Sequence, residues 1–531
     1  MLDYTIKIKQ LIDELKAACA AGGLSGDGGE YKIVTQSFLY KFLNDKFVFE
    51  VQQKTGRSID AISDGKDYEL AQMRVGLNFK REYLIENLFK RQNEEHFYGT
   101  FNDTLKAIAH ENAETLSIKT DEKAKILLFD NELFSIVQDE SKRNNLARAV
   151  INKLVQAKID FAALLNQGYD FFATIFEYMI ADYNANGGGS YAEYYTPRSV
   201  ARLMAEILVE NQDLRSIKIL DPSAGSGTLL MSIAHKIGVE KCSIYSQDIS
   251  QKSSKLLQLN LLLNNLGHSM NNVVQGNTIT HPVYGMKSSD KFDFIVSNPP
   301  FNLDFSEYRD SVANNPAYSE RFFAGVPSIP NKKKESMSIY LLFIQHLLYA
   351  LKPNGKGAIV VPTGFITAQS SIEKTIRQKL IKNNWLKGVV SMPSNIFANT
   401  GTQVSVVFID KSPTEQRPVF IDASKLGTQI KDGKNQRTLL SSDDEQKIIN
   451  AFFNSDEEDF SIRPSIDEIA AKNYSFAAGQ YFDIKIEHIP INQDEFNQKM
   501  ADYKQELKQL FNQSQQLEQE ILNNLEKVFL A

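Results

Sequence analysis

The stretch that decides the fold is Phe292-Asp293-Phe294-Ile295-Val296-Ser297, followed at once by Asn298-Pro299-Pro300-Phe301. The first six residues are mostly apolar, and this pattern predicts a buried strand. Asn-Pro and Pro-Pro pairs mark turns. The strand is therefore expected to end abruptly, with the polar side chain of Asn298 at its carboxyl end.

Strand-like and helix-like segments alternate on both sides of this turn. This alternation predicts a doubly wound, Rossmann-like α/β domain with a mostly parallel, seven-stranded sheet. The expected strands are residues 217–220, 243–247, 272–275, 292–297, 357–361, 386–392 and 403–409, and the main expected helices are 228–237, 252–266 and 339–351. Such sheets bind ligands beyond the carboxyl ends of their strands. Four of these ends carry a polar residue: Asp221, Asp248, Asn277 and Asn298.

Three domains are expected along the chain. Residues 1–183 form a helical N-terminal domain, residues 184–425 form the α/β domain, and residues 426–531 form a C-terminal region. A Gly-rich break at 184–190 separates the first two. The last helix, residues 493–530, carries Met500, Tyr503, Leu507, Leu510, Leu517 and Ile521 at alternating steps of three and four, interrupted once by Ser514. This heptad spacing predicts a coiled-coil seam for a partner helix, with packing on its own domain a nearly equal alternative.

Composition excludes several classes of protein. The 531 residues are 42% hydrophobic and 23% charged, as in an ordinary globular protein. Two cysteines and seven scattered histidines provide neither a disulfide framework nor a metal site. No membrane span or signal peptide is expected, so we expect a cytoplasmic protein. The net charge of −6 suggests that a DNA ligand would be gripped largely through another subunit.

The residues after the central strand suit an exocyclic amine. The N6 amine of adenine is a poor nucleophile because its lone pair is delocalised into the ring, so a methylating site must accept hydrogen bonds from its N–H groups. Asn298 offers a side-chain carbonyl, Pro299 offers a backbone carbonyl without a competing N–H, and Pro300 stiffens the turn. Phe301 offers a ring on which a base can stack. The alternative is a plain Pro-Pro turn with one core aromatic.

The turn after the first strand, Asp221-Pro222-Ser223-Ala224-Gly225-Ser226-Gly227, suits a nucleoside cofactor. Glycines there let the backbone approach a ligand at the start of the next helix. Leu230 replaces the third glycine of the dinucleotide fingerprint. A cofactor with a cationic amino group, such as S-adenosylmethionine, fits better, and Asp248 is placed to accept hydrogen bonds from its ribose.

The segment Asp221–Leu230, followed by Asn298–Phe301, resembles the N6-adenine DNA methyltransferases, and more narrowly the modification subunit of type I restriction–modification systems. Residues 355–362 and 400–409 are also similar to that family, and the likeness covers nearly the whole chain. A further similar segment, just before the first strand, is Glu193-Tyr194-Tyr195-Thr196-Pro197-Arg198.

The resemblance implies roles for particular residues. Segment 193–198 lines the methionine end of S-adenosylmethionine, the Ser226-Gly227-Thr228 turn cradles the cofactor, and Asp248 holds its ribose. Asn277 stands where many relatives place an aspartate that accepts from the cofactor's adenine amine. Asn298, Pro299, Pro300 and Phe301 are the implied catalytic residues.

The resemblance also implies partners. The target is an adenine flipped out of double-stranded DNA, and two copies of the chain join one specificity subunit. A restriction subunit, the motor-nuclease, completes the complex.

Two other functions compete with this interpretation. One is methylation of a protein glutamine or an RNA base, and the other is a catalytically silent scaffold. The long segment 302–336, with Lys332-Lys333-Lys334, is expected to be a solvated loop or a lid that faces DNA.

Overall fold

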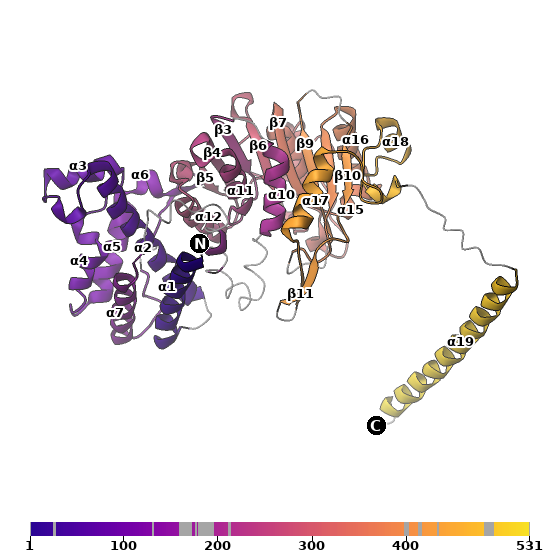
Figure 1. The fold of residues 1–531 in the computed structure, drawn as a ribbon, viewed down its shortest axis with the longest axis horizontal. Helices are drawn as coiled ribbons and strands as arrows, with labels where there is room; N and C mark the ends of the chain where they lie inside the picture. Colours follow the sequence, from indigo (N-terminus) through magenta and orange to yellow (C-terminus); the bar gives the residue numbers. More distant parts are fainter. Residues whose placement is uncertain are drawn as a thin grey trace. The chain divides into compact units, whose positions relative to one another are not determined.

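The computed structural model of the chain describes residues 2–24, 28–129, 132–158, 173–175, 178, 196–210, 214–397, 403–412, 417–432, 435–482 and 493–529. It contains two compact units, Met1–Tyr481 and Phe482–Ala531 (Figure 1). Residues 426–481, which we assigned to the C-terminal region, belong to the first unit. The domain boundary expected at residue 183 stays a prediction.

The N-terminal part of the first unit is a group of helices around an aromatic core. Tyr40, Phe47, Phe79 and Phe101 pack ring against ring, with centroid distances of 5.3–6.3 Å. The helices are α1 (Leu2–Ala21), α2 (Gly28–Thr55), α3 (Lys66–Val75), α4 (Ile85–Lys90), α5 (Phe97–Glu111), α6 (Ala113–Leu116) and α7 (Glu140–Gln156), with short 3-10 turns at Ile59–Ala61 and Arg81–Tyr83. The expected helical character is confirmed, apart from a short hairpin of β1 (Ile118–Thr120) and β2 (Lys125–Ile126).

A single large sheet forms the centre of the first unit. In the described residues its order is β13-β10-β8-β9-β7-β6-β3-β4-β5-β1-β2. Its strands beyond the β1–β2 hairpin are β3 (Ile217–Asp221), β4 (Cys242–Asp248), β5 (Val273–Gln275), β6 (Phe292–Ser297), β7 (Leu351–Pro362), β8 (Leu386–Ser391), β9 (Val404–Asp410), β10 (Val419–Asp422) and β13 (Ser461–Ile462). All seven predicted strands are present, and the mostly parallel α/β fold is confirmed.

The sheet departs from the prediction in two respects. Strand β9 inserts between β7 and β8 and runs antiparallel to both. Four short strands widen the sheet: β10 and β13 at one edge, and β1 and β2 at the other. These strands have two to four residues each, too few to show a periodic pattern, so only their pairing partners reveal them.

Helices cover the sheet and a separate hairpin extends from it. Helix α10 packs against α11, α17 and β7, whereas α14 packs against β6, β7 and α16. The helices are α10 (Arg198–Val209), α11 (Thr228–Ile237), α12 (Gln251–Leu263), α13 (Ser306–Ala313), α14 (Tyr340–Ala350), α15 (Gly364–Thr367), α16 (Ser371–Lys382), α17 (Ser442–Phe453) and α18 (Ile466–Ala471), with short 3-10 turns at Val239–Lys241, Gly267–Asn272, Ser288–Asp290, Pro316–Tyr318, Lys334–Ser336 and Ala478–Gln480. The hairpin pairs β11 (Thr428–Asp432) with β12 (Asn435–Leu439).

The second unit contains the long helix α19 (Gln493–Phe529), as predicted. Its large apolar side chains are exposed by about half or more: Phe496, Met500, Tyr503, Leu507, Leu510, Phe511, Leu517, Ile521, Leu522 and Leu525. None of the helices in the described ranges combines the length and apolarity needed to cross a bilayer.

Candidate active site

The sheet order brings the four predicted strand ends together. Strands β6, β3, β4 and β5 are consecutive neighbours and pair in parallel. Their carboxyl ends therefore lie along one edge, and the residues at these ends are, in the order of the sheet, Asn298, Asp221, Asp248 and Asn277. The chain order reverses between β3 and β6, and ligands of open α/β sheets bind at such a switch point.

The turn after β3 is held by side chains on both sides. The backbone N–H of Ser223 donates to Asp221 over 2.9 Å, and the hydroxyls of Ser223 and Ser297 lie 2.6 Å apart. Because Ser297 is the last residue of β6, this hydrogen bond ties the turn to the residue before Asn298. Sequence reasoning missed this pair, although Ser297 ends a predicted strand and Ser223 lies in the predicted glycine-rich turn.

Gly227 begins helix α11 in a left-handed conformation, with φ of 82° and ψ of 17°. A Cβ atom there would lie 2.2 Å from Cδ1 of Leu257 on helix α12. The glycine is therefore needed both for its backbone angles and for close helix packing. Ser226 and Thr228 flank it with hydroxyls 3.2 Å apart, and the carbonyl of Ser226 accepts from Nδ2 of Asn260 over 3.0 Å.

Asp248 links the second strand end to the same turn. Its Oδ2 accepts from the N–H of Gly225 and its Oδ1 from the N–H of Ser250, each over 2.8 Å. Each carboxylate oxygen has a second lone pair, so both backbone bonds leave acceptor capacity for ribose hydroxyls.

The two aspartates have raised pKa values. Burial raises the pKa of Asp221 to about 8, opposed by the Ser223 N–H and reinforced by the charge of Asp248. Burial also raises the pKa of Asp248, against the N–H groups of Ser250 and Gly225. A cationic group beside these two carboxyl groups would stabilise their charged forms and lower both pKa values.

Asn277 has a structural partner that the sequence did not reveal. Its Oδ1 accepts from the N–H of Ile279 over 2.9 Å and from the N–H of Thr280 over 3.3 Å. The oxygen expected to accept from the cofactor's adenine amine thus already serves a backbone turn. The Nδ2 group of this side chain is the part that remains for a ligand.

The segment after the Asn-Pro-Pro-Phe turn is anchored to this third strand end. The buried guanidinium of Arg321 donates to the carbonyls of Thr278 over 2.7 Å and Ile279 over 2.9 Å, and to Nδ1 of His346 over 2.9 Å. Residues 302–336 contain α13 and two 3-10 turns. The segment, expected to be a solvated loop or a lid that faces DNA, therefore contains helical turns and a buried anchor at Arg321.

The Asn-Pro-Pro-Phe turn lies beyond β6 as predicted. Asn298 is half-buried, Pro299 is buried and Pro300 is exposed. The half-buried ring of Phe301 packs edge-on against Tyr340, with centroids 6.3 Å apart. Nδ2 of Asn298 donates to Oγ1 of Thr196 over 3.2 Å, which brings the segment before α10 to the turn.

Of the segment 193–198, expected to line the methionine end of the cofactor, the structure describes the second half. Glu193, Tyr194 and Tyr195 lie outside the described residues. Thr196 is buried, and Pro197 caps helix α10. Arg198 donates to the hydroxyl of Thr174 over 2.9 Å.

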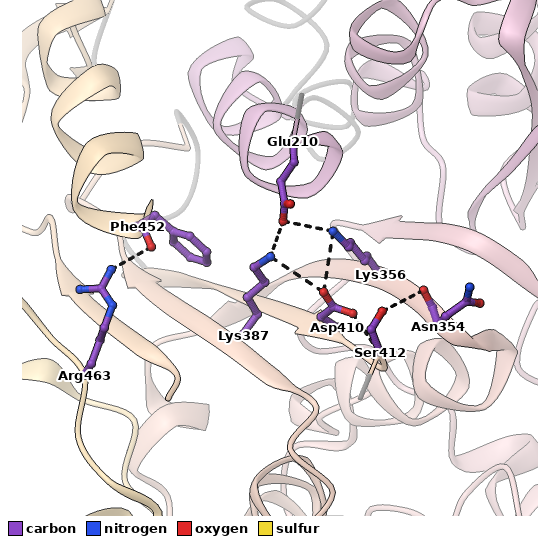
Figure 2. A network of polar contacts seen from close by, with 8 residues as sticks. All are labelled: Glu210, Asn354, Lys356, Lys387, Asp410, Ser412, Phe452 and Arg463. Atoms are coloured by element: carbon purple, nitrogen blue, oxygen red, sulfur yellow. Dashed lines mark hydrogen bonds and ion pairs between the residues drawn. The ribbon is translucent and has the colours of Figure 1, made fainter. Parts of the chain in front are cut away.

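A cavity of about 480 Å³ lies at the opposite, amino edge of the sheet, beside Ile217, Leu386 and Asp410. Figure 2 shows its charged network: Glu210, at the end of α10, contacts Lys387 and lies 3.1 Å from Nζ of Lys356. Asp410 lies 3.7 Å from Nζ of Lys356 and 3.9 Å from Nζ of Lys387. Because these charges neutralise one another, we assign the network to holding α10 on the sheet.

No group of three potential metal ligands occurs among the residues that the structure describes. The strand order, the polar carboxyl edge and the Asn-Pro-Pro-Phe turn together define a methyltransferase of the doubly wound α/β class.

Comparison with known proteins narrows this class. Residues 167–488 match the model of the N-6 DNA Methylase family. Over 514 residues the chain is 26% identical to the type I restriction enzyme MpnII methylase subunit of Mycoplasma pneumoniae, covering 91% of this chain and 89% of that protein. It is 30% identical over 373 residues to the type I restriction enzyme MjaIX methylase subunit of Methanocaldococcus jannaschii, covering 66% and 62%.

The fold has a solved counterpart. The methyltransferase subunit of the type I restriction-modification system from Streptococcus thermophilus superposes with a TM-score of 0.69 at 20% identity, covering 90% of this chain and 100% of that one. The chain belongs to the N-6 DNA methylase family, because the family model matches more than half of its length. This confirms the resemblance, the enzyme class and the type I restriction–modification context expected from the sequence.

Proposed function

We propose that this chain is the modification subunit of a type I restriction–modification complex, and that it transfers a methyl group from S-adenosylmethionine to N6 of an adenine flipped out of double-stranded DNA. The observation that carries the proposal is the orientation of Asn298. Its Nδ2 is engaged by Thr196, so Oδ1 is the end left for a substrate amino group. The carboxylates and the glycine turn for a cofactor lie at the same edge.

The residues present at this edge fit the cofactor. Asp221 and Asp248 supply carboxylates for its cationic amino group and ribose hydroxyls, and the Ser226-Gly227-Thr228 turn supplies a close backbone approach. Thr196, with segment 193–198, would line its methionine end, and Nδ2 of Asn277 would be the group that donates to its adenine. S-adenosylmethionine, when bound, supplies an electrophilic methyl group attached to a sulfonium.

The chain's own residues prepare the nucleophile. Oδ1 of Asn298 and the carbonyl of Pro299 accept from the two N6–H groups and turn the lone pair towards the methyl carbon. Phe301 stacks on the flipped base and recovers about 1–3 kcal/mol of the unstacking cost. The bound cofactor would supply the methyl carbon that N6 attacks, and its sulfur would keep the electron pair of the carbon–sulfur bond. The methylated nitrogen is then acidic enough to lose its proton to water without a strong base.

An exposed lysine run next to the turn suits the DNA backbone. Lys332, Lys333 and Lys334 are exposed, and the N–H of Leu303 donates to the carbonyl of Met337 over 3.1 Å. This bond closes the excursion on itself, so the run lies beside the residues that follow Phe301. Phosphates that flank a flipped nucleotide pass the mouth of its pocket, and lysines there provide sequence-independent contacts.

Partner subunits provide the remaining affinity for DNA and the choice of the DNA target sequence. The exposed apolar stripe of α19 (Gln493–Phe529) has the spacing of a coiled-coil seam. We propose that it binds the specificity subunit, in a complex with a second copy of this chain and, for restriction, a motor-nuclease subunit. The complex acts on DNA in the cytoplasm.

The test uses S-adenosylmethionine with a labelled methyl group and chromosomal DNA from a host that lacks the modification. The purified chain is assayed with and without its specificity subunit. Transfer of label to adenine N6 is expected with the partner present, and Asn298→Ala abolishes transfer while cofactor affinity stays within about threefold. Asn454→Ala, at the exposed end of α17, is the matched control and retains full activity. Label on protein or RNA, or full activity of Asn298→Ala, would overturn the proposal.

A further inference from the structure

The amide of Asn298 has two chemically different ends, and only one of them suits an amino group. Oδ1 accepts hydrogen bonds, whereas Nδ2 donates them. A half-turn of the amide changes its shape very little, but it places donors against the donors of the substrate. A catalytic asparagine therefore needs a neighbour that distinguishes the two orientations.

In this structure Thr196 holds one of the two orientations. Its Oγ1 lies 3.2 Å from Nδ2 of Asn298, and the side chain is buried, with 7% exposed. A hydroxyl that accepts from Nδ2 leaves Oδ1 directed to the other side of the amide. We infer that Thr196 is a positioning residue that holds the carbonyl of Asn298 towards the target amine. This inference rests on the proposed function and is separate from the proposed contact with the methionine end.

Thr196 can act in this way because α10 (Arg198–Val209) is fixed on the sheet. The carbonyl of Pro197 accepts from the N–H of Ala201 over 3.0 Å, so the residue next to Thr196 caps the helix. The carbonyl of Ala201 also accepts from Oγ of Ser232 over 3.1 Å, which joins α10 to α11.

Ion pairs of Arg202, Glu206 and Glu210 hold the rest of the helix. Arg202 lies 3.4 Å from the buried carboxylate of Glu445 on α17, and Glu206 lies 2.6 Å from Lys236 on α11. At the far end Glu210 bridges β7 and β8 through the network of Figure 2. The helix is thus pinned along its length, and the hydroxyl of Thr196 stays in place when the target base enters.

The partner of Thr196 is equally well fixed. Asn298 directly follows β6, which pairs on one side with β3 and on the other with β7. The hydroxyl of Ser297, one residue before, meets that of Ser223 at 2.6 Å, and Pro299 restricts the backbone after it. The Thr196–Asn298 bond therefore joins two rigid elements, and its removal frees the amide rather than moving the backbone.

The test compares Thr196→Val with Thr196→Ser in the chain reconstituted with its specificity subunit. Valine keeps the shape and removes the acceptor, whereas serine keeps the hydroxyl. Thr196→Val is expected to lower the single-turnover methylation rate about tenfold, because Nδ2 is left without its partner and the amide is no longer held in the productive orientation. Thr196→Ser stays within about threefold. Calorimetric titration with S-adenosylmethionine is the second readout, and its dissociation constant changes less than the rate does.

A second pair of variants, made in the Asn298→Asp chain, distinguishes a positioning role of Thr196 from a general loss of structure at the site. In Asn298→Asp both carboxylate oxygens accept, so no orientation has to be selected. Adding Thr196→Val to this variant is expected to change the rate less than about twofold. If Asn298→Asp is inactive, the same cycle is measured on affinity for unmethylated DNA with S-adenosylhomocysteine bound.

Three results would overturn the role of Thr196. These are a Thr196→Val complex as active as wild type, an equal decrease in both Asn298 backgrounds, or a decrease in cofactor affinity as large as the decrease in rate. Failure of the proposed function looks different, since the wild-type complex would then bind cofactor and transfer no label to DNA.

Discussion

Replacing Gly227 with alanine tests the idea that the cofactor turn depends on a close backbone approach. Gly227 has φ of 82° and ψ of 17° at the start of α11. An alanine in this left-handed region costs about 1–2 kcal/mol. Its Cβ would also lie 2.2 Å from Cδ1 of Leu257, which is 1% exposed and has little room to move. Overpacking of this kind costs about 1–3 kcal/mol, so Gly227→Ala should destabilise the chain by about 2–5 kcal/mol in total.

Gly76 supplies a matched control for the backbone strain. It ends α3 with φ of 78° and ψ of 24°, nearly the same conformation, and nothing lies within 4 Å of a Cβ built there. Gly76→Ala therefore carries only the left-handed strain, about 1–2 kcal/mol. The difference between the two variants isolates the clash with Leu257.

Urea unfolding followed by far-UV circular dichroism measures both destabilisations, and the fluorescence of the single tryptophan, Trp385, reports on the sheet. Calorimetric titration measures affinity for S-adenosylmethionine. We expect Gly227→Ala to be less stable than Gly76→Ala and to bind cofactor at least tenfold more weakly, because the turn must shift away from Leu257. Equal destabilisation by the two variants, with unchanged cofactor affinity in both, would refute the reasoning.

The buried carboxylate, the lysine run and the second unit each allow a further test. The folded-state pKa of Asp221, about 8, exceeds the unfolded value near 3.8, so stability should fall by up to about 1.4 kcal/mol per pH unit as pH rises between these values. In unfolding experiments Asp221→Asn should reduce this dependence of stability on pH. An unchanged pH dependence would contradict the raised pKa of Asp221. Replacing Lys332, Lys333 and Lys334 with glutamine should reduce the slope of log affinity for DNA against log salt by about 0.9 for each phosphate that is no longer neutralised, whereas an unchanged slope would place the run away from DNA. Deleting Phe482–Ala531 should abolish co-purification with the specificity subunit and leave cofactor affinity within about twofold, and retained co-purification would show that the partner binds elsewhere.

The local features of the site could be predicted from sequence because they depend on neighbouring residues. A buried strand ending in Asn298-Pro299 needs only its own apolar run and two prolines to be recognised. A glycine turn after Asp221 is equally local. The long helix α19 was predicted because its apolar residues repeat regularly over many turns.

Interactions between distant segments could not be predicted in this way. One local interaction was missed as well: Oδ1 of Asn277, considered as an acceptor for the cofactor's adenine amine, accepts from the nearby backbone N–H groups of Ile279 and Thr280. This difference arises because short-range turn geometry competes with ligand binding for the same atom. Arg321 gave no sequence signal at all, since its role depends on carbonyls that lie more than 40 residues away.

By itself the sequence determined the class of fold, the order of the strand-end residues and the chemistry that the Asn298–Phe301 turn can perform. Periodicity, strand-end polarity and proline geometry are properties of short stretches, so they can be recognised in the sequence without knowledge of the fold. Only the tertiary structure decided that β9 runs antiparallel, that Ser223 meets Ser297, and that Thr196 accepts from the amide of Asn298. These features arise when elements remote in sequence pack together, and no pattern along a single segment encodes which partner each will meet.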